Sequence, residues 1–246
     1  MGSIHKNLIF DHLYFVANAE EFEELKKIFL RFECASHSIT KADDDSWEGI
    51  YIQTRGQHYL EILKDRRTNG LGFCQRAFSP MSQSARDIMN DFPDLPWKTF
   101  ERKLDGQKWF TALSCDNYLD LTTLFNSWVM HYYQRDIQKT FTLKKYELSR
   151  LCHVQMSANP NLIEKIKLNS TWFNARTEFS NSEAIFHIQT FYSDACELKI
   201  TFDNQDEGFE FKKAEFEISK GFATEDTTLK HYKLKTAHDR LILEKI

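Results

Sequence analysis

The sequence contains few residues that interrupt regular structure and none of the short motifs that mark several common enzyme classes. Its 246 residues include only eight glycines and four prolines, whereas phenylalanine occurs 21 times. This composition predicts regular helices and strands around an aromatic core. A glycine-rich phosphate loop, a G-x-S-x-G elbow, an H-E-x-x-H helix and paired zinc-knuckle cysteines are all missing. Nucleotide hydrolysis, serine esterase action and zincin proteolysis are therefore disfavoured.

The chain also lacks the features of secreted, membrane and nucleic-acid-binding proteins. Its five cysteines are widely spaced, odd in number and without a C-x-x-C pair, which argues against a disulfide framework. No apolar run approaches the ~18 residues of a membrane helix, and the first ten residues do not predict a signal peptide. The net charge of −4 gives no electrostatic reason to expect nucleic acid. We expect a cytoplasmic protein that binds neither membranes nor nucleic acid.

The first part of the chain predicts one strand, one helix and three further strands. Residues 9–16 alternate in character as a strand does. Asn18 and Glu21 have the spacing of a helix cap with a reciprocal glutamate. The apolar residues that follow have helical spacing: Phe22, Leu25, Ile28 and Phe32. The three later strands are expected at Ser36–Lys41, Trp47–Arg55 and Gln57–Lys64, the last two joined through Gly56 as a hairpin.

Sorting these strand residues by face separates apolar side chains from polar ones, because successive residues point to opposite sides. The apolar face suits packing against the helix and collects Leu13, Phe15, Ile50, Ile52, Leu60 and Ile62. The other face collects His12, Tyr14, Tyr51, Gln53, Tyr59 and Glu61. Aromatic rings with polar tips are typical walls of a ligand cleft. We therefore interpret Tyr14, Tyr51, Gln53 and Tyr59 as binding a small molecule; buried rings with satisfied hydroxyls are an equally good interpretation of the tyrosines.

The order strand–helix–strand–strand–strand, opening with Asp11-His12 and closing with Tyr59-Leu60-Glu61-Ile62, resembles the module of the glyoxalase/bleomycin-resistance (vicinal oxygen chelate) superfamily. The runs Trp47–Ile52 and Ser127–Tyr132 look closest to an uncharacterised glyoxalase-like branch. The resemblance implies an α+β fold in which repeated βαβββ modules form a curved mixed sheet, here with a helical insertion and extra C-terminal strands. It also implies that two modules complete one site and that the protein forms a homodimer.

The resemblance further implies that His12 and Glu61 bind a divalent metal ion of unspecified identity. Such a mixed nitrogen and oxygen site suits several divalent ions. The metal would act as a Lewis acid toward a bidentate oxygen substrate. Glu61 is alternatively a catalytic group that takes a proton. The competing interpretation is that the imidazole and the carboxylate only hydrogen-bond at the cleft wall.

The pattern recurs near residue 150, where Cys152–Asn159 parallels Asp11–Asn18. His153 and Glu197 then fall at positions similar to those of His12 and Glu61. The similar spacing allows a quartet of metal ligands formed by both His–Glu pairs. We reject a reactive pair of Cys152 with His153, because neighbours on a strand point to opposite faces.

These patterns divide the chain into an N-terminal βαβββ module (1–66), a middle segment with a partial module plus helices (67–143), and a C-terminal module that is a degenerate copy of the first (144–246). In the middle segment we expect a strand at Leu71–Cys74, a helix at Gln83–Phe92, strands near Lys98–Leu104 and Trp109–Ser114, and a helix at Leu119–Tyr133. If the middle segment is the true partner module, it supplies no histidine from its first strand. The metal site would then be incomplete.

Three functions remain open at this level. The first is a metal-dependent lyase, isomerase or dioxygenase. The second is a non-enzymatic module that sequesters a small molecule without a metal. The third is an assembly protein that uses the aromatic helix expected at Leu119–Tyr133.

Overall fold

The protein folds into two eight-stranded sheets in the computed structural model. The residues that the structure describes are 8–41, 46–55, 58–64, 70–77, 81–104, 106–114, 125–133, 147–170, 175–189, 195–203, 208–220 and 224–246. Among them, no helix is long and apolar enough to cross a membrane.

The first sheet contains two successive strand–helix–three-strand sets. The first set is β1 (Leu8–Ala17), α1 (Ala19–Phe29), β2 (Ala35–Lys41), β3 (Ser46–Gln53) and β4 (Tyr59–Lys64). The second set is β5 (Leu71–Ala77), α2 (Met81–Asp91), β6 (Lys98–Leu104), β7 (Gln107–Ser114) and β8 (Phe125–Tyr132). The strand order is β2-β3-β4-β1-β5-β8-β7-β6, so the first strands of the two sets lie side by side.

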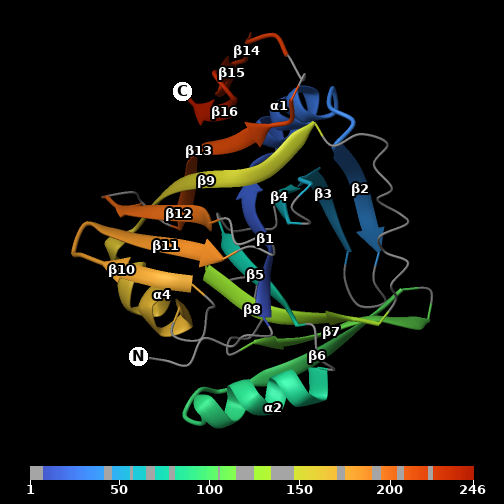
Figure 1. The fold of residues 1–246 in the computed structure, drawn as a ribbon, viewed down its shortest axis with the longest axis vertical. Helices are drawn as coiled ribbons and strands as arrows, with labels where there is room; N and C mark the ends of the chain where they lie inside the picture. The colour runs from blue at the N-terminus through green and yellow to red at the C-terminus, as the bar shows by residue number, and fades with distance from the viewer. Residues whose placement is uncertain are drawn as a thin grey trace.

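The second sheet repeats the strand order of the first position by position, although among the described residues no helix lies between β13 and β14. Its strands and helices are β9 (Leu148–Ala158), η1 (Pro160–Leu162), α4 (Ile163–Ser170), β10 (Ala175–Phe179), β11 (Glu183–Gln189), β12 (Ala195–Phe202), β13 (Phe209–Ile218), β14 (Thr227–Thr228), β15 (Tyr232–Ala237) and β16 (Arg240–Lys245). The order β10-β11-β12-β9-β13-β16-β15-β14 matches that of the first sheet. Figure 1 shows the two sheets with α1 between them and α2 at the far edge of the first.

The strands and the helix expected in residues 9–64 are confirmed, and the helix begins where its cap was predicted. The Asn18 side chain accepts a hydrogen bond from the Glu21 backbone N–H at 2.9 Å. The apolar face of α1 is buried as the periodicity predicted, with Phe22, Leu25 and Ile28 at most 1% exposed. In the middle segment, β5, α2, β6 and β7 correspond to the predicted elements. Gly56 lies outside the described residues.

The helix predicted at Leu119–Tyr133 is wrong within the described residues, because 125–132 form strand β8. This strand pairs in parallel with β5 and antiparallel with β7. The sequence positions of Phe125, Trp128 and Tyr132 are three and four apart, which is also the spacing of one face of a helix. In the strand, Trp128 and Met130 face one side and Val129 faces the other. The assembly function based on that helix loses its structural basis here. Residues 115–124 lie outside the described part.

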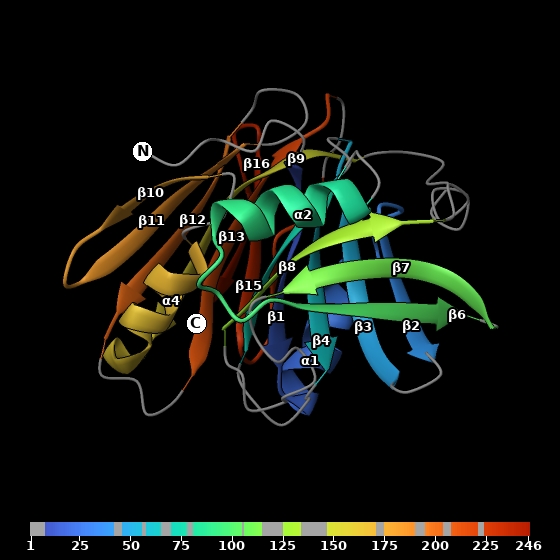
Figure 2. The same cartoon turned by 90° about the horizontal axis from the view of Figure 1, so that it is seen from below.

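The first sheet is curled so that its polar face is on the inside. Trp47 on β3 and Trp109 on β7 stack with ring centroids 6.1 Å apart and an interplanar angle of 4°. In the strand order, β4, β1, β5 and β8 separate these two strands. Rings this far apart in the order can meet only if the sheet bends back on itself. Figure 2 shows β6–β8 curving across β1–β4.

The apolar faces of the two sheets pack together into one core. Phe15 on β1 stacks on Phe211 of β13 with centroids 4.4 Å apart, and Phe29 of α1 contacts Phe216 of β13. The same cluster contains the inward residues of both sheets. The polar faces of the two sheets therefore point away from this shared core and away from each other.

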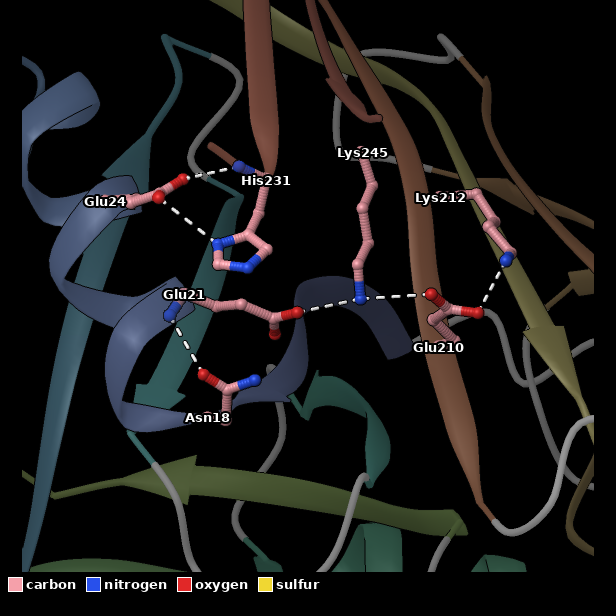
Figure 3. A network of polar contacts seen from close by, with 7 residues as sticks. All are labelled: Asn18, Glu21, Glu24, Glu210, Lys212, His231 and Lys245. Carbon is pink, nitrogen blue, oxygen red and sulfur yellow. Dashed lines mark hydrogen bonds and ion pairs between the residues drawn. The ribbon is translucent and has the colours of Figure 1, made fainter. Parts of the chain in front are cut away.

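Charged contacts join α1 to the second sheet along the edge of this core (Figure 3). Lys245 Nζ lies 2.8 Å from Glu21 Oε1 and 3.0 Å from Glu210 Oε1. Glu24 Oε2 accepts the His231 backbone N–H at 2.9 Å. Burial opposes the charge of Lys245, but the two carboxylates outweigh it and raise its pKa. The helix is thus held to both sheets.

Candidate functional site

The register of the first sheet brings the predicted His12–Glu61 pair together. In the parallel pairing of β1 with β4, His12 lies beside Tyr59, and Tyr14 lies beside Glu61. His12 Nε2 is 3.5 Å from Glu61 Oε2. Their side chains are 4% and 9% exposed. The pair therefore occupies the interior of the curled polar face, shielded from bulk water.

A β-bulge adds Asp11 to the same site. The pairing of β1 with β5 shifts register between Phe10 and His12, so Asp11 is the extra residue. A bulge re-aims the side chain of its extra residue. Asp11 Oδ2 consequently lies 2.8 Å from His12 Nδ1, and the Asp11 side chain is fully buried. The Tyr132 hydroxyl on β8 donates to the same oxygen at 3.3 Å. Strict alternation would have placed Asp11 on the opposite face, which is why the sequence did not identify it.

The second strand set contributes a thiol to the same site. Cys74 on β5 pairs directly with His12 and is fully buried. Asp11, His12 and Cys74 each place one potential ligand atom within 4.8 Å of the others. Strand β5 carries no histidine, as the sequence indicated. Cys74 was missed because its place opposite His12 depends on strand pairing that one strand's sequence does not reveal.

His12 has a carboxylate at each ring nitrogen. A neutral imidazole has only one N–H. If Nδ1 donates it to Asp11, the Nε2 lone pair faces the Glu61 carboxylate. In this tautomer, a metal ion placed between the Nε2 lone pair and the Glu61 carboxylate would be held by both acceptors. The donor set of imidazole, carboxylate and thiol is chemically suited to a divalent ion.

The tyrosine hydroxyls report the same negative environment. Burial raises the pKa of Tyr59 well above its ordinary value, and Tyr132, Asp11 and Glu61 raise it further. Burial and then the Glu61 charge likewise raise the pKa of Tyr51. Both phenols are therefore held in the neutral form, in which they can donate hydrogen bonds.

Aromatic rings enclose the His12–Glu61 pair. Tyr59 stacks on His12, with centroids 4.4 Å apart and planes 18° apart. Tyr14 lies 5.4 Å from the Trp128 ring, and its own ring covers Gly72, where a Cβ would lie 1.9 Å from Tyr14 Cε1. These rings have the positions expected for walls of a ligand site.

Two further residues predicted to bind a small molecule lie on β3. The Tyr51 hydroxyl accepts a hydrogen bond from Trp47 Nε1 at 3.0 Å. Gln53 is half-buried and pairs with Tyr59. All four predicted ligand-binding residues thus belong to the strands around the His12–Glu61 pair, whereas their roles in binding stay predictions.

The second predicted pair, His153 and Glu197, lies on the other sheet. His153 on β9 pairs with Glu197 on β12, and Nδ1 is 3.1 Å from Oε1. Their side chains are 20% and 38% exposed. Because the polar faces of the two sheets point away from the shared core, a single quartet of ligands does not form. The sequence located both pairs but could not show that each has its own sheet.

Comparison with known proteins supports the fold. No protein-family model matches the chain, and no curated protein matches it. A solved structure of a hypothetical protein from Staphylococcus aureus matches with a TM-score of 0.52 and 12% identity, over 82% of this chain and 87% of that one. Each sheet joins two four-strand sets through their first strands. The fold is of the glyoxalase type.

Two dioxygenases also match this glyoxalase-type fold in part. A xylose isomerase-like TIM barrel/4-hydroxyphenylpyruvate dioxygenase fusion protein has a TM-score of 0.49 and 11% identity, over 87% of this chain and 37% of that one. Homoprotocatechuate 2,3-dioxygenase from B. fuscum has a TM-score of 0.41 and 14% identity, over 80% of this chain and 54% of that one. This chain spans less than half the length of the fusion protein and about half the length of the homoprotocatechuate dioxygenase. The activities in these names describe those proteins.

Proposed function

We propose that this glyoxalase-type protein binds a divalent metal ion and a small oxygen-bearing organic molecule on the curled polar face of its first sheet. One observation carries the proposal. The buried His12 imidazole lies between the Asp11 and Glu61 carboxylates, beside the Cys74 thiol. Such a group of acceptors is stable when a cation joins it.

The residues divide naturally into ligands and a positioning residue. His12 Nε2 and a Glu61 oxygen, 3.5 Å apart, would hold the metal, and Cys74, whose sulfur lies within 4.8 Å of the His12 and Asp11 ligand atoms, is the candidate third ligand. Asp11 would accept the Nδ1–H and so fix the tautomer and the orientation of the ring, as carboxylates behind metal-bound histidines do. When bound, the metal would supply a Lewis acid that polarises a carbonyl or an enediol oxygen.

The surrounding side chains would bind and orient the organic molecule. Tyr59 packs flat on His12 and limits the approach to one side of the imidazole. The raised pKa values of Tyr51 and Tyr59 keep their hydroxyls protonated, so these groups donate hydrogen bonds rather than remove protons. As an alternative to binding the metal, Glu61 would take a proton from the bound molecule. Lyase, isomerase and dioxygenase reactions are the classes to test.

A sequestering module without catalysis is the second candidate. The ligand face is closely enclosed, with Tyr14 and Tyr51 each 8% exposed. A site of this kind excludes water and favours retention of a bound molecule over rapid release. A ligand that raises the melting temperature of the protein without being converted supports this candidate.

The metal centre is tested by cobalt substitution and metal analysis. Protein purified without chelator is expected to bind cobalt and show a thiolate-to-metal absorption band. Cys74→Ser should remove the band, and His12→Gln/Glu61→Gln should remove the metal, since each change deletes a ligand. Metal content equal in the wild type and the double variant would refute these ligands. His153→Gln/Glu197→Gln is the matched control and should keep the thiolate band.

A further inference from the structure

The segment that leads into β4 is hydrogen-bonded to the start of β9, across the boundary between the two sheets. The Arg55 backbone N–H donates to the Leu148 carbonyl oxygen at 3.0 Å. The Leu151 backbone N–H donates to Nε2 of His58 at 3.1 Å, between residues that are 93 positions apart in the sequence. These two bonds therefore join the sheets in addition to the packed rings of the core.

His58 lies on the core side of the first sheet and is held there by its own backbone. The residue is 2% exposed, and its ring centroid lies 5.5 Å from that of Phe10, which belongs to the shared core. Its carbonyl oxygen accepts hydrogen bonds from Thr54 Oγ1 at 2.7 Å and from the Thr54 N–H at 3.2 Å. The next residue, Tyr59, stacks on His12 in the candidate site. A role for His58 is therefore independent of the function proposed for that site.

The hydrogen bond from Leu151 determines where the His58 ring carries its proton. A neutral imidazole has one N–H and one lone pair, whereas an imidazolium has two N–H groups and no acceptor. Because Nε2 accepts the Leu151 N–H, the proton of the neutral ring is on Nδ1. A second proton can enter only at Nε2, where it would face the Leu151 N–H. The hydrogen bond and a positive charge on the ring therefore exclude each other.

The charged and titratable side chains on the elements around His58 share one property, since each contacts a group other than this ring. They are Asp11 with His12, Glu147 with the Cys34 backbone N–H, Arg150 with Glu217, and Cys152 with Arg240. The side chain of Arg55 belongs to an exposed residue. The group that faces Nε2 is an N–H, and both this contact and burial oppose a charge on the ring.

We propose that the His58–Leu151 hydrogen bond is a pH switch at the boundary between the two sheets, made when the ring is neutral and broken when the ring takes up a proton. Histidine is the side chain that ordinarily changes its charge between about pH 5 and 8. The unfolded chain takes up this proton without loss, whereas the folded protein must give up the bond. The unfolded state thus binds more protons, and stability falls as the pH falls through this range.

Two amide substitutions separate the acceptor from the charge. Glutamine has its side-chain oxygen as many bonds from Cα as Nε2 of histidine, whereas asparagine ends one atom sooner. In urea denaturation of the full chain from about pH 8 to about pH 5, the unfolding constant of the wild type should rise by about 5–100-fold more than that of His58→Gln, the effect of leaving one buried donor unsatisfied. At about pH 8, His58→Asn should already be less stable than His58→Gln by a similar factor. Equal pH dependence of the wild type and His58→Gln would overturn the proposal.

The matched control is His37→Gln. His37 Nε2 lies 2.8 Å from Glu48 Oε1, so this imidazole pairs with a carboxylate and not with an N–H. The variant should keep the acid-dependent loss of stability that the wild type shows. If the loss disappears in His37→Gln as it does in His58→Gln, the assignment to His58 is wrong.

NMR of the unaltered protein tests the switch without any substitution. Near pH 8, His58 should have a protonated Nδ1 and an acceptor Nε2, and at about pH 5 the ring should be charged and the Leu151 amide signal shifted. The Thr54 amide binds the His58 carbonyl oxygen rather than the ring, so its signal should shift less. A ring that stays neutral at about pH 5, or one that becomes charged while the Leu151 signal stays in place, would refute the switch.

Discussion

The two sheets have the same strand order but polar faces of opposite character. On the first sheet, Tyr14, Tyr51 and Trp128 are each at most 8% exposed and close around a buried imidazole. On the second, His153 and Glu197 are partly open to solvent. The shared scaffold therefore determines where a polar face lies, and the side chains determine whether it is a dry aromatic interior or a wet charged surface. A buried face strengthens electrostatic interactions; an exposed one permits exchange with solvent.

The bulges on the two first strands sharpen the contrast. In β9 the register shifts around Cys152, at the position that Asp11 has in β1. The Cys152 thiol contacts the Arg240 guanidinium. In the first sheet, by contrast, Asp11 places a carboxylate beside the His12 imidazole. Burial raises the pKa of Cys152, although Arg240 and Arg150 act in the opposite direction. The same β-bulge thus holds a carboxylate, Asp11, in one sheet and a protonated thiol, Cys152, in the other.

The largest expected effect is the loss of an aromatic wall. Trp128→Ala should lower the free energy of unfolding by about 3–5 kcal/mol, because it empties a large buried volume next to Tyr14 and His12. Urea denaturation measures the change. Glu197→Gln on the exposed face should stay within about 0.5 kcal/mol. Equal effects of the two substitutions would break the distinction between a packed and an open face.

A smaller effect is expected where a ring lies on a glycine. Gly72→Ala places a Cβ 1.9 Å from Tyr14 Cε1, and the displaced ring should cost about 1–3 kcal/mol of stability. Thermal unfolding of both single variants and of Gly72→Ala/Tyr14→Ala gives the coupling between the two positions. Gly49→Ala is the control, since its Cβ would meet only the far end of Tyr51, at 3.1 Å. A cost independent of Tyr14 would contradict the close approach.

The smallest effect concerns alkaline pH. The pKa of Tyr59 is higher in the folded protein than its ordinary value of 10.0. Below pH 10.0 the hydroxyl is protonated in both the folded and the unfolded protein, and its contribution to the free energy of unfolding is fully present. As pH rises through the folded pKa this contribution is lost, because the hydroxyl ionises at a lower pH in the unfolded chain. Tyr59→Phe should therefore make the fall in stability above about pH 10 shallower, by under about 1 kcal/mol at about pH 10.5.

This prediction is checked by urea denaturation at a series of alkaline pH values. Glu197→Gln should leave the alkaline slope as it is in the wild type. If Tyr59→Phe also leaves the slope unchanged, the Tyr59 hydroxyl is not in the enclosed environment described here.

The sequence predicted the fold best where the alternation of strand side chains and the helix-capping residue gave the same result. In the first strand set, Asn18 began the helix, and the strand faces sorted without conflict. In β8 the aromatic spacing of Phe125, Trp128 and Tyr132 fits a helix as well as a strand. Only pairing with β5 and β7 decides between them. Local periodicity carries no information about such partners.

The site was predictable to the extent that it depends on one strand's alternation. His12 and Glu61 were found in this way, and they meet at 3.5 Å. Asp11 required a bulge, and Cys74 required knowledge of which strands are neighbours. The sequence also merged two pairs into one quartet, because it does not show that the two sheets present their polar faces in opposite directions.

The position of α1 has a consequence for dissecting the protein. Phe29 on this helix and Phe15 on the strand before it contact rings of β13 in the other sheet. If residues 8–133 or 147–246 were expressed alone, these rings would be exposed to water, and each fragment should fold poorly and aggregate. When the two fragments are mixed, the ring contacts between the two sheets should form again. Neither sheet can therefore be exchanged for another without redesigning the rings that face it.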